Sequence, residues 1–336
     1  MHAKKWHLLA ILLVVAMLLG ACQPASTPAP KTTGQPAAGG AAQPAKPRYH
    51  FVVIHNNADH PSITATAKGF EDEAAVYGIK VTFFDPAFDP QKQISMIENA
   101  IALKPDVIFV NAVDPAAVVP ALKKVHDAGI PLIMHNADTN EEGRQYSLAF
   151  VGSDYVEQGR AVGKTMAEQL PNGSRGVVIL GKPGQTGVQE RIDGAKEAIK
   201  ASGKDIQFID QQPAEWMKDK ALTVMQDFLT RYPSGKINFV YALDDPMALG
   251  ALEAIKAAGR QKEIKVFGVN GNKEACQAIK NGEMGGTALQ LSYLTGVYCV
   301  RAGYDVMQGR LIPKWIVPPT AGVTPANVDQ WMDKCW

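Results

Sequence analysis

From Tyr49 onward, short apolar runs alternate with longer segments whose apolar residues recur at helical spacing. Asp106–Asn111 (DVIFVN) is an uninterrupted apolar run of the kind found in strands buried inside parallel sheets. The expected strands are His50–Ile54, Ile79–Phe84, Asp106–Asn111, Ile130–His135, Leu148–Val151, Gly176–Leu180, Ile206–Asp210, Lys236–Ala242, Ile264–Val269 and Gly286–Leu291. The expected helices are Ile63–Tyr77, Pro90–Leu103, Asp114–Ala128, Tyr155–Leu170, Val188–Ala201, Glu215–Arg231, a helix that Gly259 ends, Lys273–Lys280 and Tyr293–Gln308.

This strand–helix alternation restarts after Gly152–Asp154, and both series have similar lengths. Repeated β-α units imply mostly parallel sheets with helices on both faces. We therefore expect an α/β fold of two doubly wound, Rossmann-like domains joined by a hinge, with a ligand cleft between them. The expected lobes are residues 49–152 plus 291–319 and residues 153–290 plus 320–336.

The first 22 residues have the pattern of a lipoprotein signal peptide. Lys4 and Lys5 precede the apolar run Leu8–Leu19, which is about a dozen residues and short of the ~20 that a membrane span needs. Cys22 follows Leu-Gly-Ala where the run ends, so we expect it to be lipidated; the alternative is a plain signal peptide with a chance cysteine. Residues 23–48 are rich in Pro, Ala and Gly, which predicts a disordered tether. The protein should then lie outside the cytoplasm, anchored to a bacterial membrane.

The composition limits which partners and metal sites we expect. The 336 residues are 46% hydrophobic and 20% charged, with a net charge of +1, which gives no argument for a nucleic-acid partner. Besides Cys22 there are Cys276, Cys299 and Cys335, of which two could pair, although the sequence does not say which. No CxxC motif or Cys/His cluster suggests zinc. We expect no cofactor.

Polar residues gather at the expected carboxyl ends of the strands, where ligands bind in open α/β sheets. The stretch Phe239–Gly259 illustrates this: a strand runs into Asp244-Asp245-Pro246 and then into a helix. We expect Asp245, which directly precedes Pro246, to cap that helix and Asp244 to contact a ligand. Turn chemistry alone explains any one such residue, but their number in both halves favours a polar cleft.

At these positions the chain resembles the type I periplasmic binding proteins, above all the ribose-binding branch of the sugar-binding components of ABC importers. The resemblance covers about Tyr49 to Pro319. Its most specific segments are Gln189–Gly194 (QERIDG), Gln212–Trp216 (QPAEW), Asp245–Ala251 (DPMALGA), Phe267–Gly271 (FGVNG) and Ala288–Gln290 (ALQ).

The resemblance implies roles for individual residues. Arg191 stands where members of the family have an arginine that hydrogen-bonds sugar hydroxyls. The alternative is a surface salt bridge with Glu190 or Asp193. Trp216 stands at an aromatic stacking position, with a core tryptophan as the alternative, and Asp244 falls where many relatives have Asn. We expect Arg191 to balance the charge of Asp244 in the closed cleft. The full expected ligand-binding set is Asn56, His60, His135, Asn136, Arg191, Trp216, Asp244, Asn270 and Gln290.

The first half departs from the ribose-type pattern. Asn136-Ala137 replaces an Asp-Arg pair, and Pro61 is followed by Ser62 and Ile63 instead of two stacking aromatics. The first lobe should thus lack both an arginine and an aromatic clamp, which argues against ribose itself. His55, His60 and His135 could in principle gather a metal ion, but neutral hydrogen-bonding or rim-exposed histidines fit their spacing better. We read Gly181–Gly187 as a flexible loop that delivers Arg191 and not as a phosphate loop.

These features together predict a monomeric receptor that binds a monosaccharide or sugar alcohol and delivers it to an ABC permease, closing about a hinge. The same fold could instead serve a nucleoside, a furanosyl signal molecule or a sensory partner. A transcriptional regulator would need an N-terminal helix-turn-helix, where this chain has a signal peptide and a tether. No GxSxG motif or convergent pair of carboxylates supports an enzyme.

Overall fold

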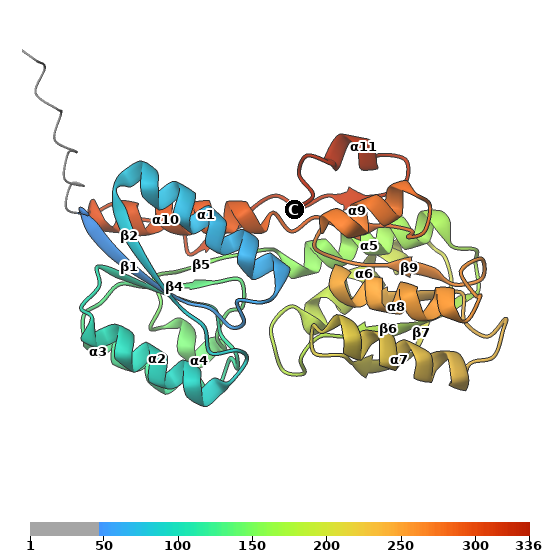
Figure 1. The fold of residues 1–336 in the computed structure, drawn as a ribbon, viewed down its shortest axis with the longest axis horizontal. Helices are drawn as coiled ribbons and strands as arrows, with labels where there is room; N and C mark the ends of the chain where they lie inside the picture. The colour runs from blue at the N-terminus through green and yellow to red at the C-terminus, as the bar shows by residue number, and fades with distance from the viewer. Residues whose placement is uncertain (1–46) are drawn as a thin grey trace, which may run out of the picture. The chain divides into compact units, whose positions relative to one another are not determined.

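The computed structural model of the chain describes residues 47–336, in which two large sheets have only parallel strand pairs (Figure 1). The predicted α/β fold with two parallel sheets is therefore confirmed. The predicted signal peptide, Cys22 and nearly all of the predicted tether lie outside the described residues. Within the described part, no helix is long and apolar enough to cross a membrane.

The first sheet contains six strands in the order β11-β5-β4-β3-β1-β2. We call the part of the molecule around this sheet lobe 1. Its apolar strands are fully buried in the middle of the sheet, between two hydrophobic clusters, one on each face. The strands are β1 (Tyr49–Ile54), β2 (Ile79–Phe84), β3 (Val107–Val110), β4 (Leu132–His135), β5 (Ala149–Val151) and β11 (Trp315–Ile316).

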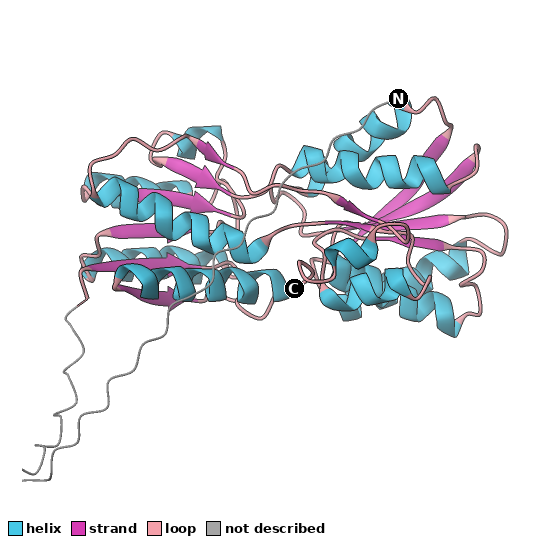
Figure 2. Cartoon of the chain, turned by 90° about the horizontal axis from the view of Figure 1, so that it is seen from above, coloured by secondary structure: helices cyan, strands magenta, loops and turns pink. Residues whose placement is uncertain are grey.

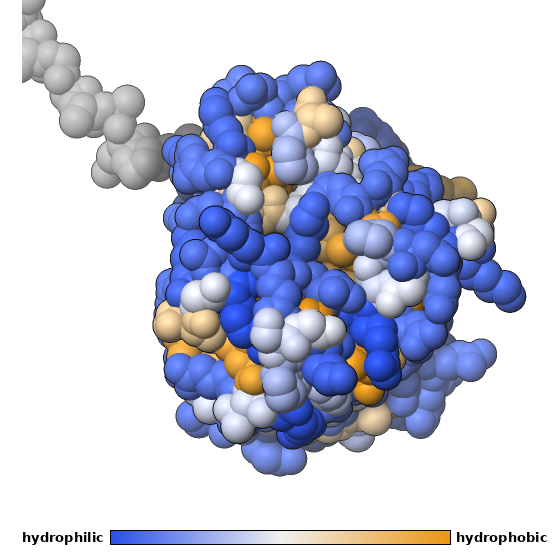
Figure 3. Space-filling view, turned by 90° about the vertical axis from the view of Figure 1, so that its right-hand side faces the viewer, coloured by the Kyte–Doolittle hydropathy of each residue, from blue (hydrophilic) through white to orange (hydrophobic). Residues whose placement is uncertain are grey.

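The second sheet contains four strands in the order β7-β6-β8-β9, and the part around it is lobe 2. Its strands are β6 (Ser174–Leu180), β7 (Ile206–Pro213), β8 (Phe239–Ala242) and β9 (Lys265–Phe267). A separate antiparallel pair joins β10 (Thr287–Ala288) to β12 (Gly322–Val323). The face of the molecule that lobe 2 presents in Figure 3 is mostly hydrophilic, with hydrophobic residues in small separate groups.

Helices cover both faces of each large sheet (Figure 2). In lobe 1, α1 packs against α10, which returns from late in the sequence, and in lobe 2 α5 packs against α6 and α7 against α8. The helices are α1 (Pro61–Tyr77), α2 (Pro90–Ala102), α3 (Val119–Asp127), α4 (Glu141–Arg144), α5 (Tyr155–Gln169), α6 (Val188–Ala201), α7 (Lys218–Arg231), α8 (Asp245–Ala257), α9 (Lys273–Lys280), α10 (Ser292–Met307) and α11 (Val328–Trp331).

The chain passes between the lobes after β5, after β10 and after β11, so three segments connect them. The C-terminal segment ends beside the second of these connections. A disulfide between Cys276 in α9 and Cys335 holds it there, and the Trp336 indole donates to the backbone oxygen of Gln290 at 2.7 Å. We call this bond the C-terminal disulfide. The third cysteine, Cys299, is free and buried in α10.

Several element boundaries differ from those expected. The helix expected from Glu215 begins only at Lys218, because Glu215 and Trp216 have positive φ angles of 54° and 67°, which a helix does not allow. The helix expected from Asp114 begins at Val119 after a turn. The strand expected at 286–291 is reduced to two residues.

Candidate functional site

A cavity lies between the lobes, at the carboxyl ends of both sheets. The space open to the centres of water-sized molecules is about 70 Å³. A single water needs about 10–15 Å³ of such space, so the cavity has room for one small compound. From lobe 1 the lining residues are Asn56, His60, Ser62, Ile63, Phe88, Asn111, Asn136 and Ala137. From lobe 2 they are Tyr155, Gln185, Thr186, Arg191, Trp216, Asp244, Asn270 and Gln290.

Arg191, in the first turns of α6, is the buried cation of this cavity, with only 4% of its surface exposed. Its Nη1 donates to the Leu243 oxygen at 2.7 Å, and its Nε to Gln158 Oε1 at 3.0 Å. Its Nη2 donates to Gln290 Oε1 at 2.9 Å and to Asn270 Oδ1 at 3.3 Å. These bonds use four of the five guanidinium N–H groups, which leaves one on Nη1.

The surroundings of Arg191 do not contain the surface salt bridge that the sequence left as an alternative. Among the described residues, no carboxylate lies within salt-bridge distance of Arg191, so neither Glu190 nor Asp193 pairs with it. Oriented carbonyl and amide dipoles solvate the charge instead, and the rings of Tyr155 and Trp216 lie 5.1 Å and 5.6 Å from its guanidinium carbon. The arginine is thus held rigidly, with one donor left for a ligand.

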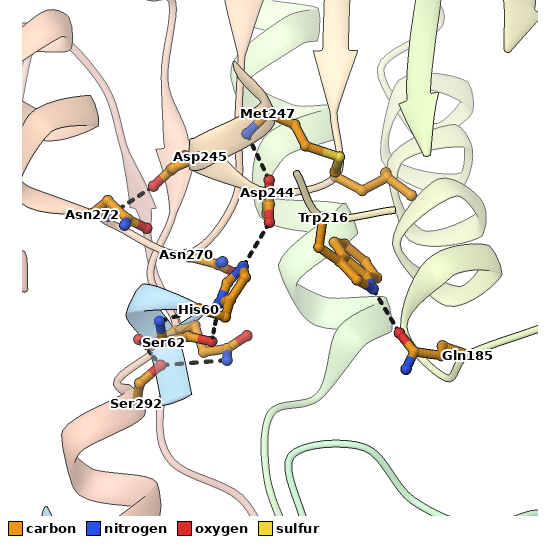
Figure 4. A network of polar contacts seen from close by, with 12 residues as sticks. His60, Ser62, Gln185, Trp216, Asp244, Asp245, Met247, Asn270, Asn272 and Ser292 are labelled. Carbon is orange, nitrogen blue, oxygen red and sulfur yellow. Dashed lines mark hydrogen bonds and ion pairs between the residues drawn. The ribbon is translucent and has the colours of Figure 1, made fainter. Parts of the chain in front are cut away.

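Asp244 pairs across the cleft with His60 and not with Arg191, which corrects the expected charge balance. His60 Nε2 lies 3.0 Å from Asp244 Oδ2, and the Asp244 side chain is fully buried (Figure 4). His60 Nδ1 accepts from the Ser62 backbone N–H at 3.2 Å, capping α1. With Nδ1 acting as an acceptor, the neutral ring carries its proton on Nε2 and donates it to Asp244. The Asp244 carboxylate that lines the cavity therefore already accepts a hydrogen bond from His60.

Asp244, and not Asp245, caps α8. Its Oδ1 accepts from the Met247 N–H at 2.8 Å. Pro246 occupies the second helical position and not the first, so the capping residue lies one position earlier than expected. Asp245 points away into lobe 2, where it accepts from the Gly271 and Asn272 N–H groups and the Thr287 hydroxyl. Burial raises the pKa of Asp245 to about 8. It fixes the loop that carries Asn270.

Aromatic rings lie on both sides of the cavity. Trp216 comes from the β7–α7 connection in lobe 2, and its Nε1 donates to Gln185 Oε1 at 2.6 Å (Figure 4). Gly181 makes room for this ring, since a Cβ there would lie 2.0 Å from it. Phe88 lines the cavity from lobe 1 with a positive φ of 62°. Ser62 and Ile63 line the cavity where the ribose-type pattern has its aromatic clamp, and a different loop places one aromatic ring on the lobe 1 side.

Side-chain amides complete the lining. Asn136 and Asn270 both have positive φ, at 53° and 120°, and asparagine tolerates this region better than most residues. Asn111 is fully buried, and its Oδ1 accepts from the Ala137 N–H while its Nδ2 has no partner within the described residues. A buried N–H donor without a partner is costly, which makes Asn111 Nδ2 an unsatisfied group beside the cavity.

His135 is placed differently from the prediction. It is fully buried in lobe 1, with its ring 5.6 Å from Phe70 and 5.7 Å from His55, and it does not line the cavity. As strand residues alternate in direction, His135 follows Ile133 into the core beneath α1 and α10. Neither ring nitrogen of His55 or His135 has a hydrogen-bond partner in the described residues, contrary to the expected hydrogen-bonding or rim roles. Burial lowers the pKa of His55 to about 4 and that of His135 well below its ordinary value.

The β6–α6 loop, residues 181–187, joins the lobes directly as well as leading to Arg191. Lys182 Nζ donates to the Phe88 oxygen at 3.1 Å and Gln185 Nε2 to the Val113 oxygen at 2.9 Å. Near its base, the Tyr155 hydroxyl donates to the Asn136 oxygen, and burial raises the pKa of this hydroxyl, which keeps it a neutral donor. The described structure is thus a conformation in which the two lobes touch around the cavity.

Eight of the nine predicted site residues line the cavity, and His135 is the exception. The lining residues that were not predicted include Phe88, Tyr155 and Gln185. They lie in turns or at a helix start, where an aromatic or amide residue gives no signal in a single sequence. Among the described residues, no group of three metal-ligating side chains comes together.

Two parallel-sheet lobes with a small polar cavity between their strand ends define a two-lobed ligand-binding protein. The comparisons agree with this class. The periplasmic binding protein domain matches residues 51–311. This chain belongs to that family, as its sequence predicted.

Named relatives are similar over most of their length. The ribose import binding protein RbsB of Bacillus subtilis is 32% identical over 261 residues, covering 78% of this chain and 82% of that protein. The structure of a Caulobacter myo-inositol binding protein bound to myo-inositol shares 30% identity with a TM-score of 0.78, covering 84% and 95%. An ABC transporter solute binding protein from Bacillus halodurans with bound myo-inositol shares 27% identity with a TM-score of 0.79, covering 86% and 99%.

Proposed function

We propose that this protein is an extracytoplasmic receptor that binds one neutral monosaccharide or cyclic polyol in the cavity and delivers it to an ABC permease. The observation that carries the proposal is the chemistry of the cavity. Its arginine is held by dipoles, its aspartate is already hydrogen-bonded to His60, and amides surround both. Such a site offers donors and acceptors without a free charge, which suits hydroxyl groups better than an ionic ligand.

The aromatic rings support the same ligand class. Phe88 and Trp216 line the cavity from opposite lobes, so an alicyclic ring with apolar C–H groups can contact rings on both sides. The family and its members, which include ribose import and myo-inositol binding proteins, point the same way. Since lobe 1 lacks the arginine of the ribose-type pattern, we place cyclitols and hexoses ahead of ribose.

The remaining parts of the proposal concern delivery. We propose that residues 49–152 with 291–319 and residues 153–290 with 320–336 move as two bodies about the three connecting segments, and that the permease reads the closed form. We also propose that Cys22 carries the lipid that keeps the receptor, a monomer, near its permease. Cys22 lies outside the described residues, so its sequence context is the support.

A thermal-shift screen of the full chain tests the ligand class. The panel contains pentoses, hexoses, cyclitols and nucleosides. A true ligand at a hundred times its Kd stabilises the folded state by about 2.7 kcal/mol. Stabilisation by a sugar or cyclitol supports the proposal. Stabilisation by nucleosides alone, or by no member of the panel, refutes it.

A further inference from the structure

A second cavity lies next to the ligand cavity, and Tyr155 and Thr186 line both. The space open to the centres of water-sized molecules is about 380 Å³, several times that of the ligand cavity. Its walls come from β5 and the edge strand β11 of lobe 1 and from the starts of α5 and α6 in lobe 2. The function proposed above makes no use of it.

Trp315 is the main apolar feature of this second cavity. It lies on the edge strand β11 with 52% of its surface exposed, an unusual position for so large a ring. The ring is nevertheless held in place: Phe150 packs edge-on at 5.2 Å, and the guanidinium carbon of Arg144 lies 5.2 Å from the ring centre. A fixed, half-exposed indole offers an apolar face with little entropic cost of ordering.

One guanidinium and three carboxylates line the cavity around Trp315: Arg144, Asp138, Asp154 and Glu190. The Arg144 Nε donates to the nearly buried Asp138 at 2.8 Å, which neutralises that pair and leaves the terminal nitrogens of Arg144 without a hydrogen-bond partner in the described residues. Asp154 and Glu190 each use one oxygen at the start of a helix, accepting from Glu157 N–H and Gly187 N–H. The positive ends of α5 and α6 offset these two charges.

The second oxygens of Asp154 and Glu190 have no hydrogen-bond partner within residues 47–336. The cavity therefore holds free acceptors on the lobe 2 side and free donors on Arg144, beside an exposed indole. Hydroxyl groups use both kinds of partner, whereas an anion or a cation would use only one.

We propose that this cavity is a second binding site, which takes a separate polyhydroxy molecule of the same chemical class as the ligand. The proposal rests on the proposed function for that class. The wall between the two sites contains two contacts between the lobes, from the Tyr155 hydroxyl to the Asn136 oxygen and from the Asp138 N–H to Thr186 Oγ1. The sites are therefore separate compartments when the lobes touch, and the second molecule occupies the outer one.

Calorimetric titration of the full chain with myo-inositol and with trehalose tests the proposal. For at least one of these compounds we expect a second, weaker binding event. Trp315→Ala should weaken that event at least about tenfold, or 1.4 kcal/mol, and leave the event at the first site unchanged. Leu311→Ala is the matched control: it removes another exposed apolar side chain just before β11, and both events should persist.

Arg191→Ala separates this proposal from the function proposed above, because it should abolish the first event and spare the second. Absence of a second event with both compounds, or a second event that Trp315→Ala does not weaken, overturns the second site. If Trp315→Ala impairs uptake in cells while no second event exists, the surface belongs to a contact with the permease, and the proposal is equally overturned.

Discussion

The hydrogen bond between His60 and Asp244 joins the lobes inside the cavity, so it should stabilise the closed conformation and raise ligand affinity. Two substitutions remove it without removing a helix cap. In His60→Asn, the amide oxygen can still accept from the Ser62 N–H but is too short to reach Asp244. In Asp244→Asn, the amide oxygen can still accept from the Met247 N–H. Both residues also line the cavity, so the coupling energy of the two substitutions, and not either single effect, reports the contact itself.

The magnitude follows from the burial of the pair. The exposed fractions of the two side chains are 11% for His60 and 0% for Asp244, so water screens the bond little. A hydrogen bond to a charged group contributes about 1.5–3 kcal/mol. We therefore expect each single variant to weaken ligand affinity roughly tenfold, or about 1.4 kcal/mol, and the double variant to be little worse than either, which gives a coupling energy of about 1.4 kcal/mol.

Calorimetric titration of the four proteins with the ligand identified by the screen measures this coupling. Asp89→Asn is the control, because Asp89 caps α2 and does not line the cavity. It should leave affinity unchanged. Additive effects of the two substitutions, with a coupling energy near zero, would show that the contact does not contribute to closure.

Three further predictions concern stability and the shape of the site. Because the pKa of His55 in the folded state is about 4, below its ordinary 6.5, its contribution to stability is complete above pH 6.5 and is lost as the pH falls from 6.5 to about 4. Between pH 7.5 and 5 this amounts to about 2 kcal/mol in the free energy of unfolding measured with urea. His55→Leu should reduce the dependence of this free energy on pH, and an unchanged dependence contradicts the assignment. The C-terminal disulfide joins residues 59 apart, so Cys335→Ser should lower the free energy of unfolding by roughly 2–4 kcal/mol; no change in the urea midpoint would show that the bond does not form. Gly181→Ala should displace the Trp216 ring and weaken ligand binding with little change in Tm, and unaltered affinity would remove Trp216 from the site.

The fold was predictable because the signals for it are local and repeated. Each buried strand is an apolar run, and helix-ending glycines such as Gly78 and Gly259 adopt positive φ in the structure. Part of the site was predictable because parallel strands bring their carboxyl ends to the same edge of a sheet. Asn136 and Asn270 could be placed there without any knowledge of contacts between the lobes.

The sequence could not show which way a side chain points or which distant residue it contacts. His135 ends a strand as the other site residues do, but the alternation of side chains turns it into the core. Asp244 pairs with His60 from a segment 184 residues away, which no local pattern encodes. The partner of Cys276 was equally open, because the choice between Cys299 and Cys335 depends on the tail folding back over α9.

The central claim is that one neutral polyhydroxy molecule binds between the lobes, where Arg191 donates its remaining N–H group to it. Calorimetric titration of the screen ligand into wild type, Arg191→Lys and Arg191→Ala tests this most directly, with Tm measured on each ligand-free protein. We predict a stoichiometry of one at this site for wild type. Both variants should lose at least about a hundredfold in affinity, because Lys keeps the charge but not the planar donor geometry. Wild-type affinity in a folded Arg191→Ala variant would contradict the account.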